Sequence, residues 1–236
     1  MSVGARIATA EGKRRYVRTL FATIAHRYDL ITGLLSYGQD RAWKRRLVTL
    51  AAPAAGTVAL DLATGTGDIA FLLAERSVRT VGLDLTPGMI DLAQAKRGSR
   101  ALPRFLVGDM MTLPFGAGSF DLVTTGYGLR NVPDLTQAID EIYRVLRSGG
   151  RVLSLDFNRP SSAIVRSVYL GYLYIVGGLV GWVLHGDRDT YQYIPASIRT
   201  YPGAEAVVAL MKARGFSSAR YYPVLGGLMA IHDARK

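Results

Sequence analysis

Three carboxylates stand at or near the ends of successive apolar runs, where they could bind one polar ligand together. Asp61, Asp84 and Asp109 are the three, and a turn containing Gly65 and Gly67 follows the first. In open sheets of parallel strands, ligands bind beyond the carboxyl ends of the strands. The pattern therefore predicts a ligand site built from three strand ends and one loop.

The spacing of these residues is typical of a nucleoside site. Asp84 lies 23 residues after Asp61 and could accept hydrogen bonds from two ribose hydroxyls. Asp109 could accept one from an adenine amino group, with the backbone of Met110 beside it. The two glycines would let the backbone approach the ligand at the N-terminus of a helix.

The charge of the loop favours one nucleoside over another. Asp68 follows Gly67 directly, and Asp61 lies just upstream. Two carboxylates repel the pyrophosphate of a dinucleotide. They suit S-adenosylmethionine, which carries an ammonium and a sulfonium and whose own carboxylate can face the helix N-terminus. The sequence therefore predicts a site for this methyl donor.

Short apolar runs alternate with stretches of helical periodicity over most of the chain. Such strands indicate a mostly parallel sheet covered by helices on both faces, an α/β doubly wound fold. Two runs near the C-terminus are close enough to form an antiparallel pair at one edge. The expected strands are 57–62, 80–85, 104–109, 120–125, 151–157, 219–225 and 227–233, and the expected helices are 68–76, 88–97, 135–147 and 204–214.

The first fifty residues combine helical periodicity with most of the excess charge. They hold ten Lys and Arg against three acids, so 10 − 3 = +7 of the net charge of +11. We expect helices joined around Gly33 and Gly38. A basic surface can bind nucleic acid or anionic lipid. No aromatic pattern typical of RNA binding accompanies it, so we expect no nucleic acid and favour anionic lipid.

One segment of twenty residues, 167–186, contains no Lys, Arg, Asp or Glu. Its length fits a membrane-spanning helix. Spanning would cut the last two strands off from the sheet, and Gly177 and Gly178 would weaken a helix at its centre. We therefore expect a buried or interfacial segment whose aromatic residues suit a membrane surface.

Several longer motifs resemble the ubiquinone/menaquinone biosynthesis C-methyltransferases of the UbiE/MenG type. They occur in one order from Phe21 to His232, which is almost the whole chain. GLRNVPD and YQYIPASI are far more specific than the glycine loop. The motifs are FATIAHRYD, LSYGQDRAWKR, LDLATGTGDIA, DLTPGMI, LPFGAGSFDLVTTGYGLRNVPD, EIYRVLRSGGRVLSLDFNRP, YQYIPASIRTYP and GGLMAIH.

The resemblance implies a class I S-adenosylmethionine-dependent methyltransferase with a seven-stranded sheet, an N-terminal helical lid and a polyprenylated quinol as acceptor. The donor-binding positions of the family fall on Thr66, Asp84, Asp109 and Met110. Gly126 stands where the family often has Ser, so one side-chain contact would be missing.

Two departures from the family flank the expected mouth of the acceptor site. Thr32 stands where Asn is usual, and Asp40 stands where His is common. The acceptor is therefore less closely specified than the donor. We favour demethylmenaquinol over a ubiquinol precursor, 2-methoxy-6-polyprenyl-1,4-benzoquinol.

Methyl transfer to an aromatic carbon needs an electron-rich ring and the removal of one hydroxyl proton. Arg130 and Asn131 follow the fourth strand, where the acceptor ring should lie. Arg130 could stabilise a developing quinolate, and Asn131 could orient a hydroxyl or a water. Tyr28 or His26, from the N-terminal helices, could relay the proton.

Two other functions fit parts of the pattern. One is a methyltransferase for another small molecule or for RNA, and the other is a donor-binding protein without catalysis. The apolar segment and the GLRNV motif favour the quinol over the first. The intact acidic set favours an enzyme over the second.

The remaining expectations concern organisation and location. We expect a helical lid facing the membrane over 1–50 and a Rossmann-like domain over 51–236, with an apolar insertion at 161–200. The chain has no Cys, and its three His lack ligand spacing, so we expect no metal. No secretory signal is visible, which favours a cytoplasmic protein attached peripherally to the membrane. A homo-oligomer is compatible with this expectation.

Overall fold

The computed structural model describes residues 3–36, 38–185 and 191–236. Their centre is a seven-stranded sheet of order β3-β2-β1-β4-β5-β7-β6, in which β7 runs antiparallel to both of its neighbours. The expected fold, including the antiparallel edge pair, is therefore confirmed. The strands are β1 Val58–Leu62, β2 Arg79–Asp84, β3 Arg104–Val107, β4 Phe120–Gly126, β5 Leu146–Phe157, β6 Ser218–Val224 and β7 Met229–Arg235.

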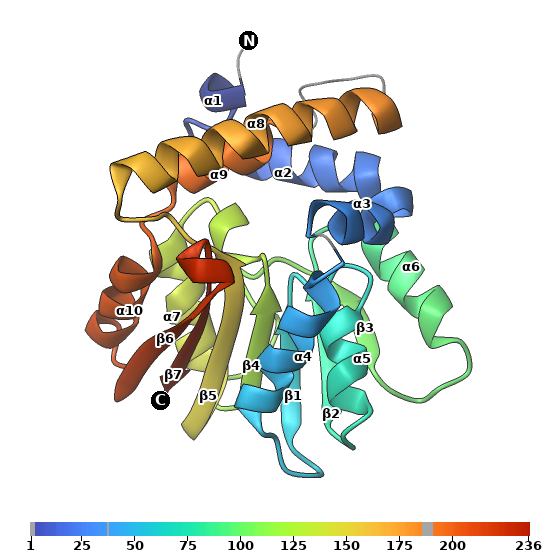
Figure 1. Cartoon of the computed structure of the whole chain (residues 1–236). Helices are drawn as coiled ribbons and strands as arrows, with labels where there is room; N and C mark the ends of the chain where they lie inside the picture. Colours follow the sequence, from blue (N-terminus) through green and yellow to red (C-terminus); the bar gives the residue numbers. More distant parts are fainter. Residues whose placement is uncertain (1–2, 37, 186–190) are drawn as a thin grey trace.

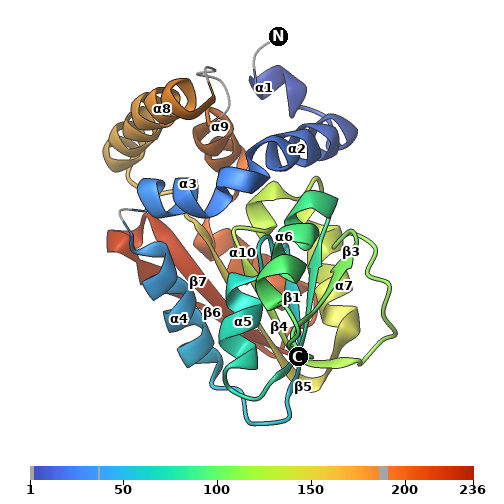
Figure 2. The ribbon, with the colours of Figure 1, turned by 90° about the vertical axis from the view of Figure 1, so that its right-hand side faces the viewer.

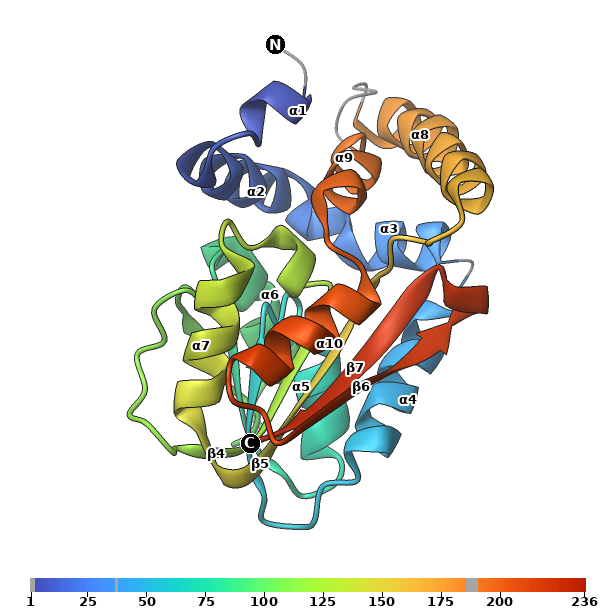
Figure 3. The ribbon, with the colours of Figure 1, turned by 90° about the vertical axis from the view of Figure 1, so that its left-hand side faces the viewer.

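Helices cover both faces of this sheet, which explains why the strands are apolar on both sides. α4 and α5 lie over one face (Figure 2), and α7 and α10 lie over the other (Figure 3). Successive strand residues point to opposite faces, so Val152 packs with α7 while Leu153 packs with α4. These helices and α6 are α4 Asp40–Ala51, α5 Asp68–Ala74, α6 Pro87–Arg97, α7 Leu135–Val145 and α10 Ala204–Ala213.

A separate layer of helices lies across the carboxyl ends of the parallel strands (Figure 1). It combines segments from the start of the chain with segments that follow β5. We call it the helical layer. Its members are α1 Val3–Arg6, α2 Ala10–Ile24, the short helix η1 Ala25–Arg27, α3 Tyr28–Leu35, α8 Ala163–His185 and α9 Tyr193–Thr200.

The helical layer differs in two ways from the N-terminal unit expected from the sequence. Gly33 lies inside α3 and joins nothing, whereas Gly38, with φ at 74°, does lie between α3 and α4. α4 also packs against β5 and α5, so it belongs with the sheet. Residues 1–50 have the same basic, helical composition throughout, although α2 and α3 pack in the helical layer and α4 packs on the sheet. The sequence therefore contains no sign of a boundary before α4.

α8 carries the uncharged segment, whose end at Gly186 lies outside the described residues. On one face of α8, Tyr169, Leu170 and Leu173 are buried against the rest of the protein. Its other face is equally apolar yet exposed. Of the described helices, it is the only one long and apolar enough to cross a membrane, and 28% of that window is buried. The exposed apolar residues on it are Ile164, Val165, Val168, Tyr174, Ile175, Leu179, Trp182 and Val183.

Close packing between β2 and β3 predicts a strict requirement for glycine at position 82. A Cβ on Gly82 would lie 2.7 Å from the Phe105 ring and 2.8 Å from Thr64 Oγ1. Gly82→Ala should therefore lower the free energy of unfolding by about 1–3 kcal/mol, measured by urea titration. Gly88→Ala, in open space on α6, is the control and should be neutral or stabilising. Equal stability of Gly82→Ala and the wild type would contradict this packing.

Candidate active site

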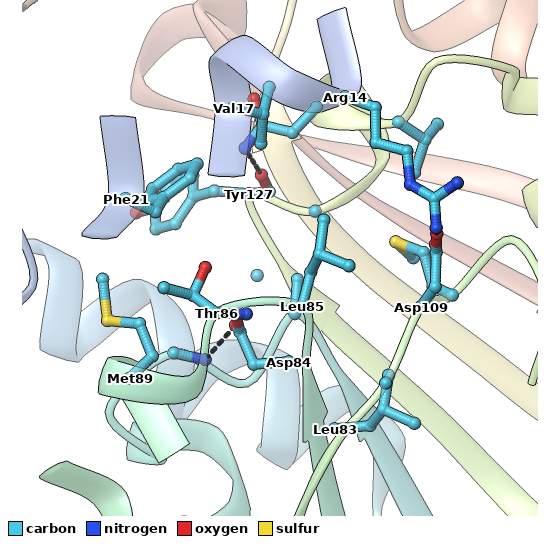
Figure 4. Close-up of a pocket in the computed structure, with 18 of the residues that line it drawn as sticks. Arg14, Val17, Phe21, Leu83, Asp84, Leu85, Thr86, Met89, Asp109 and Tyr127 are labelled. Carbon is cyan, nitrogen blue, oxygen red and sulfur yellow. Dashed lines mark hydrogen bonds and ion pairs between the residues drawn. The ribbon is translucent and has the colours of Figure 1, made fainter. Parts of the chain in front are cut away.

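The strand ends and the helical layer enclose a first cavity of about 90 Å³, which we call the donor cavity. Of the residues expected to bind the donor, it contains Gly65, Asp84, Asp109, Met110 and Gly126. Figure 4 shows this cavity with α2 above it and the ends of β2 and β3 below it. The strand-end pattern therefore converges as the sequence predicts for these five residues.

Asp84 is fixed by backbone groups at the bottom of the donor cavity. It accepts hydrogen bonds from the N–H of Gly65 at 2.9 Å and of Thr86 at 2.8 Å. Burial raises the pKa of Asp84, while these two N–H groups oppose the shift. The carboxylate is thus held in one orientation next to the glycine loop, as a ribose-binding group requires.

Asp109 faces the same cavity and is paired with the helical layer. The guanidinium of Arg14, on α2, lies 2.5 Å from one of its oxygens (Figure 4), and the Met111 N–H donates to the other. Arg14 was not expected from the sequence, because nothing in a basic helix marks one arginine as facing a strand end. The pair links α2 to the proposed adenine site.

Three other expected donor ligands lie outside this cavity and support the loop instead. Asp61 is fully buried, where it accepts hydrogen bonds from the hydroxyls of Thr64 and Thr124. Thr66 donates to Asp29 on α3 at 2.7 Å. Gly67 has φ at 91° and caps α5, a conformation that favours glycine.

A second, larger cavity of about 260 Å³ lies beside the first, between the sheet and the helical layer. We call it the acceptor cavity. Its lining is mostly apolar or aromatic; the helices α2, α3, α8 and α9 supply much of it, and α4 and residues at or next to the ends of β4, β5 and β7 supply most of the rest. It contains Leu20, Phe21, Ile24, Tyr28, Ile31, Leu35, Trp43, Tyr127, Phe157, Tyr169, Tyr172, Leu173, Tyr191, Tyr193, Ile194, Leu225, Leu228 and Met229, with the more polar Thr32, Ser36, Gln39 and Arg130.

The two cavities share one wall. Phe21, Tyr28 and Tyr127 line both of them. Tyr28, one of the two residues for which the sequence suggested a proton relay, thus lies between the two cavities. His26 is exposed and lines neither cavity, because η1 turns it outward, so the structure does not support a proton relay through His26.

Arg130 lies in the wall of the acceptor cavity and is buried in a polar cluster. Its Nε lies 3.2 Å from Asp156 Oδ1, and its backbone N–H donates to the other oxygen of Asp156. Nη1 donates to Ser197 on α9 at 2.7 Å. The guanidinium also lies 4.9 Å from the ring centroid of Phe157. The cluster joins the loop after β4 to the end of β5 and to α9.

Asn131 connects this cluster to the shared wall. Its Nδ2 donates to the backbone carbonyl of Tyr127 at 2.7 Å, and its Oδ1 accepts from the hydroxyl of Tyr193 at 3.0 Å. Tyr127 has φ at 60°, a strained value for a residue with a side chain. Asn131 therefore lines the donor cavity and also holds Tyr127 in that conformation.

Several functional residues were missed by the sequence analysis. Asp156 lies at the end of an apolar run and carries the same signal as Asp61, Asp84 and Asp109, so it could have been found. Tyr127 and Ser197 carry no such signal, because only the folded chain brings them to the cavities.

The fold is the one found in solved S-adenosylmethionine-dependent methyltransferases. A possible histamine N-methyltransferase from Thermotoga maritima matches over 93% of this chain and 99% of its own, with a TM-score of 0.67 and 18% identity. Phosphoethanolamine N-methyltransferase 2 from Haemonchus contortus, solved with S-adenosyl-L-methionine, matches over 83% of this chain and 52% of its own, with a TM-score of 0.62 and 16% identity.

The sequence comparisons give the family. Residues 9–236 match the model of the ubiE/COQ5 methyltransferase family, and the chain belongs to that family. A demethylmenaquinone methyltransferase from Thermus thermophilus is 44% identical over 90% of this chain and 98% of its own length. A second protein of that name, from Deinococcus radiodurans, is 39% identical over 97% of both. The protein is thus an enzyme, a methyltransferase that uses S-adenosylmethionine as donor.

The buried pair of Arg130 and Asp156 predicts a large cost for removing one partner. Arg130→Ala leaves an unpaired carboxylate inside the protein and should lower the free energy of unfolding by about 3–5 kcal/mol in urea titrations. Adding Asp156→Asn should recover part of that loss, since no buried charge remains. Arg214→Ala, which breaks an exposed pair with Asp140, is the control. If Arg130→Ala were as stable as this control, the pair would not stabilise the fold.

Asp61 predicts a dependence of stability on pH. Burial raises its pKa to about 7 from an ordinary 3.8, although its two threonine hydrogen bonds act against the shift. The folded protein then holds this proton more tightly than the unfolded chain. The protonated Asp61 side chain therefore adds up to about 4 kcal/mol to the free energy of unfolding. This stabilisation is fully present below about pH 4 and is lost as the pH rises through 7.

Asp61→Asn should remove that dependence. The difference in unfolding free energy between wild type and variant should change between pH 4 and pH 7, measured by urea titration at each pH. For Asp140→Asn, on an exposed face of α7, the same difference should stay flat. A flat difference for Asp61→Asn as well would mean that Asp61 is charged throughout.

Proposed function

We propose that this enzyme methylates a ring carbon of a polyprenylated quinol, converting demethylmenaquinol to menaquinol in respiratory quinone biosynthesis. The observation that carries the proposal is the acceptor cavity. It is mostly apolar, it lies directly beside the donor cavity, and it is bounded by the long apolar helix α8. Such a lining suits an aromatic ring with a polyprenyl tail and does not suit nucleic acid.

The names of the relatives support demethylmenaquinol as the acceptor. The Thermus and Deinococcus proteins are named for it, at 44% and 39% identity. A ubiquinone/menaquinone biosynthesis C-methyltransferase UbiE from Dinoroseobacter shibae is 36% identical over 99% of this chain and 95% of its own. The second candidate acceptor is therefore the ubiquinol precursor.

The proposed roles follow from position. Arg130 has five N–H donors and always carries its charge, so it can stabilise an oxyanion on the ring while Asp156 and Ser197 hold it in place. Tyr28 separates the two cavities and orients the ring toward the donor. Asp84, Asp109, Gly65 and Met110 hold the nucleoside.

The assay that tests this function is methyl transfer from labelled S-adenosylmethionine. Demethylmenaquinol and the ubiquinol precursor are offered separately in detergent, and the products are identified by mass spectrometry. We expect methylated product from demethylmenaquinol at a higher kcat/KM than from the precursor. Product from the precursor alone would show that the ubiquinol precursor, and not demethylmenaquinol, is the acceptor. No product from either quinol, with donor binding intact, would refute the proposal.

The proposed acceptor also implies where the enzyme works. The exposed face of α8 combines aliphatic residues with Tyr174 and Trp182, and Leu30 and Leu34 on α3 are exposed in the same helical layer. Arg18, on α2, adds positive charge to that layer. These features support peripheral attachment to an anionic lipid surface on the cytoplasmic side, with the tail entering the acceptor cavity from the membrane.

Binding to lipid vesicles tests this attachment. We expect the protein to sediment with vesicles containing phosphatidylglycerol more than with neutral ones, and less at high salt. Ile175→Asp on α8 should weaken sedimentation several-fold. Leu106→Asp, at an exposed apolar position on the edge strand β3, is the matched control and should not. Equal sedimentation of the two variants would place the lipid contact elsewhere.

A further inference from the structure

The shared wall contains a hydrogen bond that the proposed roles leave unused. The Tyr127 hydroxyl donates to Asp40 Oδ1 at 2.6 Å, between residues 87 positions apart in the chain. Tyr127 is 9% exposed and Asp40 is 7% exposed, so the bond is shielded from water. Asp40 is also one of the positions, with Thr32 and Gly126, at which this chain differs from the usual residue of the family it resembles.

Asp40 belongs to a row of alternating charges that runs away from the cavities. Lys44 Nζ lies 2.6 Å from the second oxygen of Asp40 and 2.9 Å from Asp68. The row holds two carboxylates and one buried ammonium. If Asp40 takes up a proton, Lys44 and Asp68 remain as an intact ion pair. The site can therefore hold one extra proton without leaving a buried charge alone.

The proposed reaction has one proton to remove. Phe21, Tyr28 and Tyr127 are the side chains that line both cavities. Of the two tyrosine hydroxyls, that of Tyr127 donates a hydrogen bond to a carboxylate in the described structure. Arg130, the charged residue in the lining of the acceptor cavity, cannot accept a proton, and Thr32, Ser36 and Gln39 line only that cavity and not the wall shared with the donor cavity. The geometry therefore leaves the Tyr127 hydroxyl as the group best placed to take the proton.

From this arrangement, and on the basis of the proposed function, we infer that Tyr127 is a catalytic residue that passes the proton of the quinol hydroxyl to Asp40. The quinol O–H bond breaks as its proton moves to the Tyr127 oxygen. The proton of Tyr127 moves to Asp40 in the same step. The electron pair left on the quinol oxygen flows into the ring, and the ring carbon attacks the donor methyl, whose bond to sulfur breaks with its electrons staying on sulfur.

The relay then runs backward to restore the aromatic ring. Asp40 returns its proton through Tyr127 to the ring oxygen, while the proton on the newly methylated carbon leaves to water. One proton is released for each methyl transferred, and the wall returns to its starting state. Burial and Asp40 raise the pKa of Tyr127 well above its ordinary value, so Tyr127 passes a proton on without existing as a free tyrosinate.

Other charged groups surround the relay and bear on its response to pH. Burial acts to lower the pKa of Lys44, but Tyr28, Asp40 and Asp68 outweigh it and raise that pKa, which keeps the ammonium charged. The charged and titratable groups around Tyr127, Asp40, Lys44 and Asp68 are Tyr28 from α3, Arg41 from α4, Asp61 from β1, Asp84 from β2, Lys96 from α6 and Asp156 from β5.

Tyr127→Phe and Asp40→Asn test the relay in the full-length enzyme with demethylmenaquinol. Each should lower kcat by about 100-fold or more, while the Kd for S-adenosylmethionine, from calorimetry, changes less than about twofold. The double variant should be no slower than the slower single variant, because each substitution interrupts the same proton path. The matched controls Tyr221→Phe and Asp140→Asn alter exposed hydrogen bonds on β6 and α7 and should keep the wild-type kcat.

The pH profile separates a relay from a merely structural role. Above neutral pH the wild-type kcat should be flat, whereas in both variants it should rise about tenfold per pH unit as hydroxide replaces the relay. Wild-type kcat in Tyr127→Phe, or a variant profile parallel to the wild type, would overturn the inference. If the wild type methylates no quinol at all, the proposed function fails first and the relay fails with it.

Discussion

The buried pair of Arg130 and Asp156 is the contact on which the rest of the site depends. Burying two charges is costly unless their geometry is fixed and their remaining hydrogen bonds are satisfied. Here Ser197 and Asn131 satisfy Arg130, and backbone N–H groups satisfy Asp156. Meeting that requirement ties the short helix η2 (Leu129–Asn131), the end of β5 and α9 together. One charged group is thereby placed in the wall of a cavity that is otherwise mostly apolar.

The donor side is organised around the same loop. Asn131 holds the carbonyl of Tyr127, and Tyr127 accepts the strain of a left-handed backbone at the point where the two cavities meet. The helical layer reaches this point through Phe21 and Tyr28 and reaches the strand ends through the pair of Arg14 and Asp109. The helical layer therefore contributes to the walls of both cavities, which suits a reaction that brings two substrates together.

The sequence predicted the sheet and most of the donor site because both follow from local pattern. Strand periodicity fixes where Asp84 and Asp109 end up, and the sheet brings those ends together. Asp61 shares that pattern, but its carboxylate accepts hydrogen bonds from two threonine hydroxyls and does not line the donor cavity. Only the side-chain contacts of the folded protein determine this orientation. Lys44 was counted with a basic surface, yet it is buried between carboxylates. His26 and the Tyr127–Asp40 bond likewise depend on how distant helices dock, which no spacing rule contains.

The most direct test of the account is a structure of the enzyme with S-adenosylhomocysteine and a short-chain demethylmenaquinol. We expect the nucleoside between Asp84 and Asp109, and the quinol ring against Arg130 and Tyr127. The sulfur and the reacting ring carbon should face each other across the shared wall, with the tail directed between α3 and α8. A quinol bound outside the acceptor cavity, or a ring turned away from the sulfur, would contradict it.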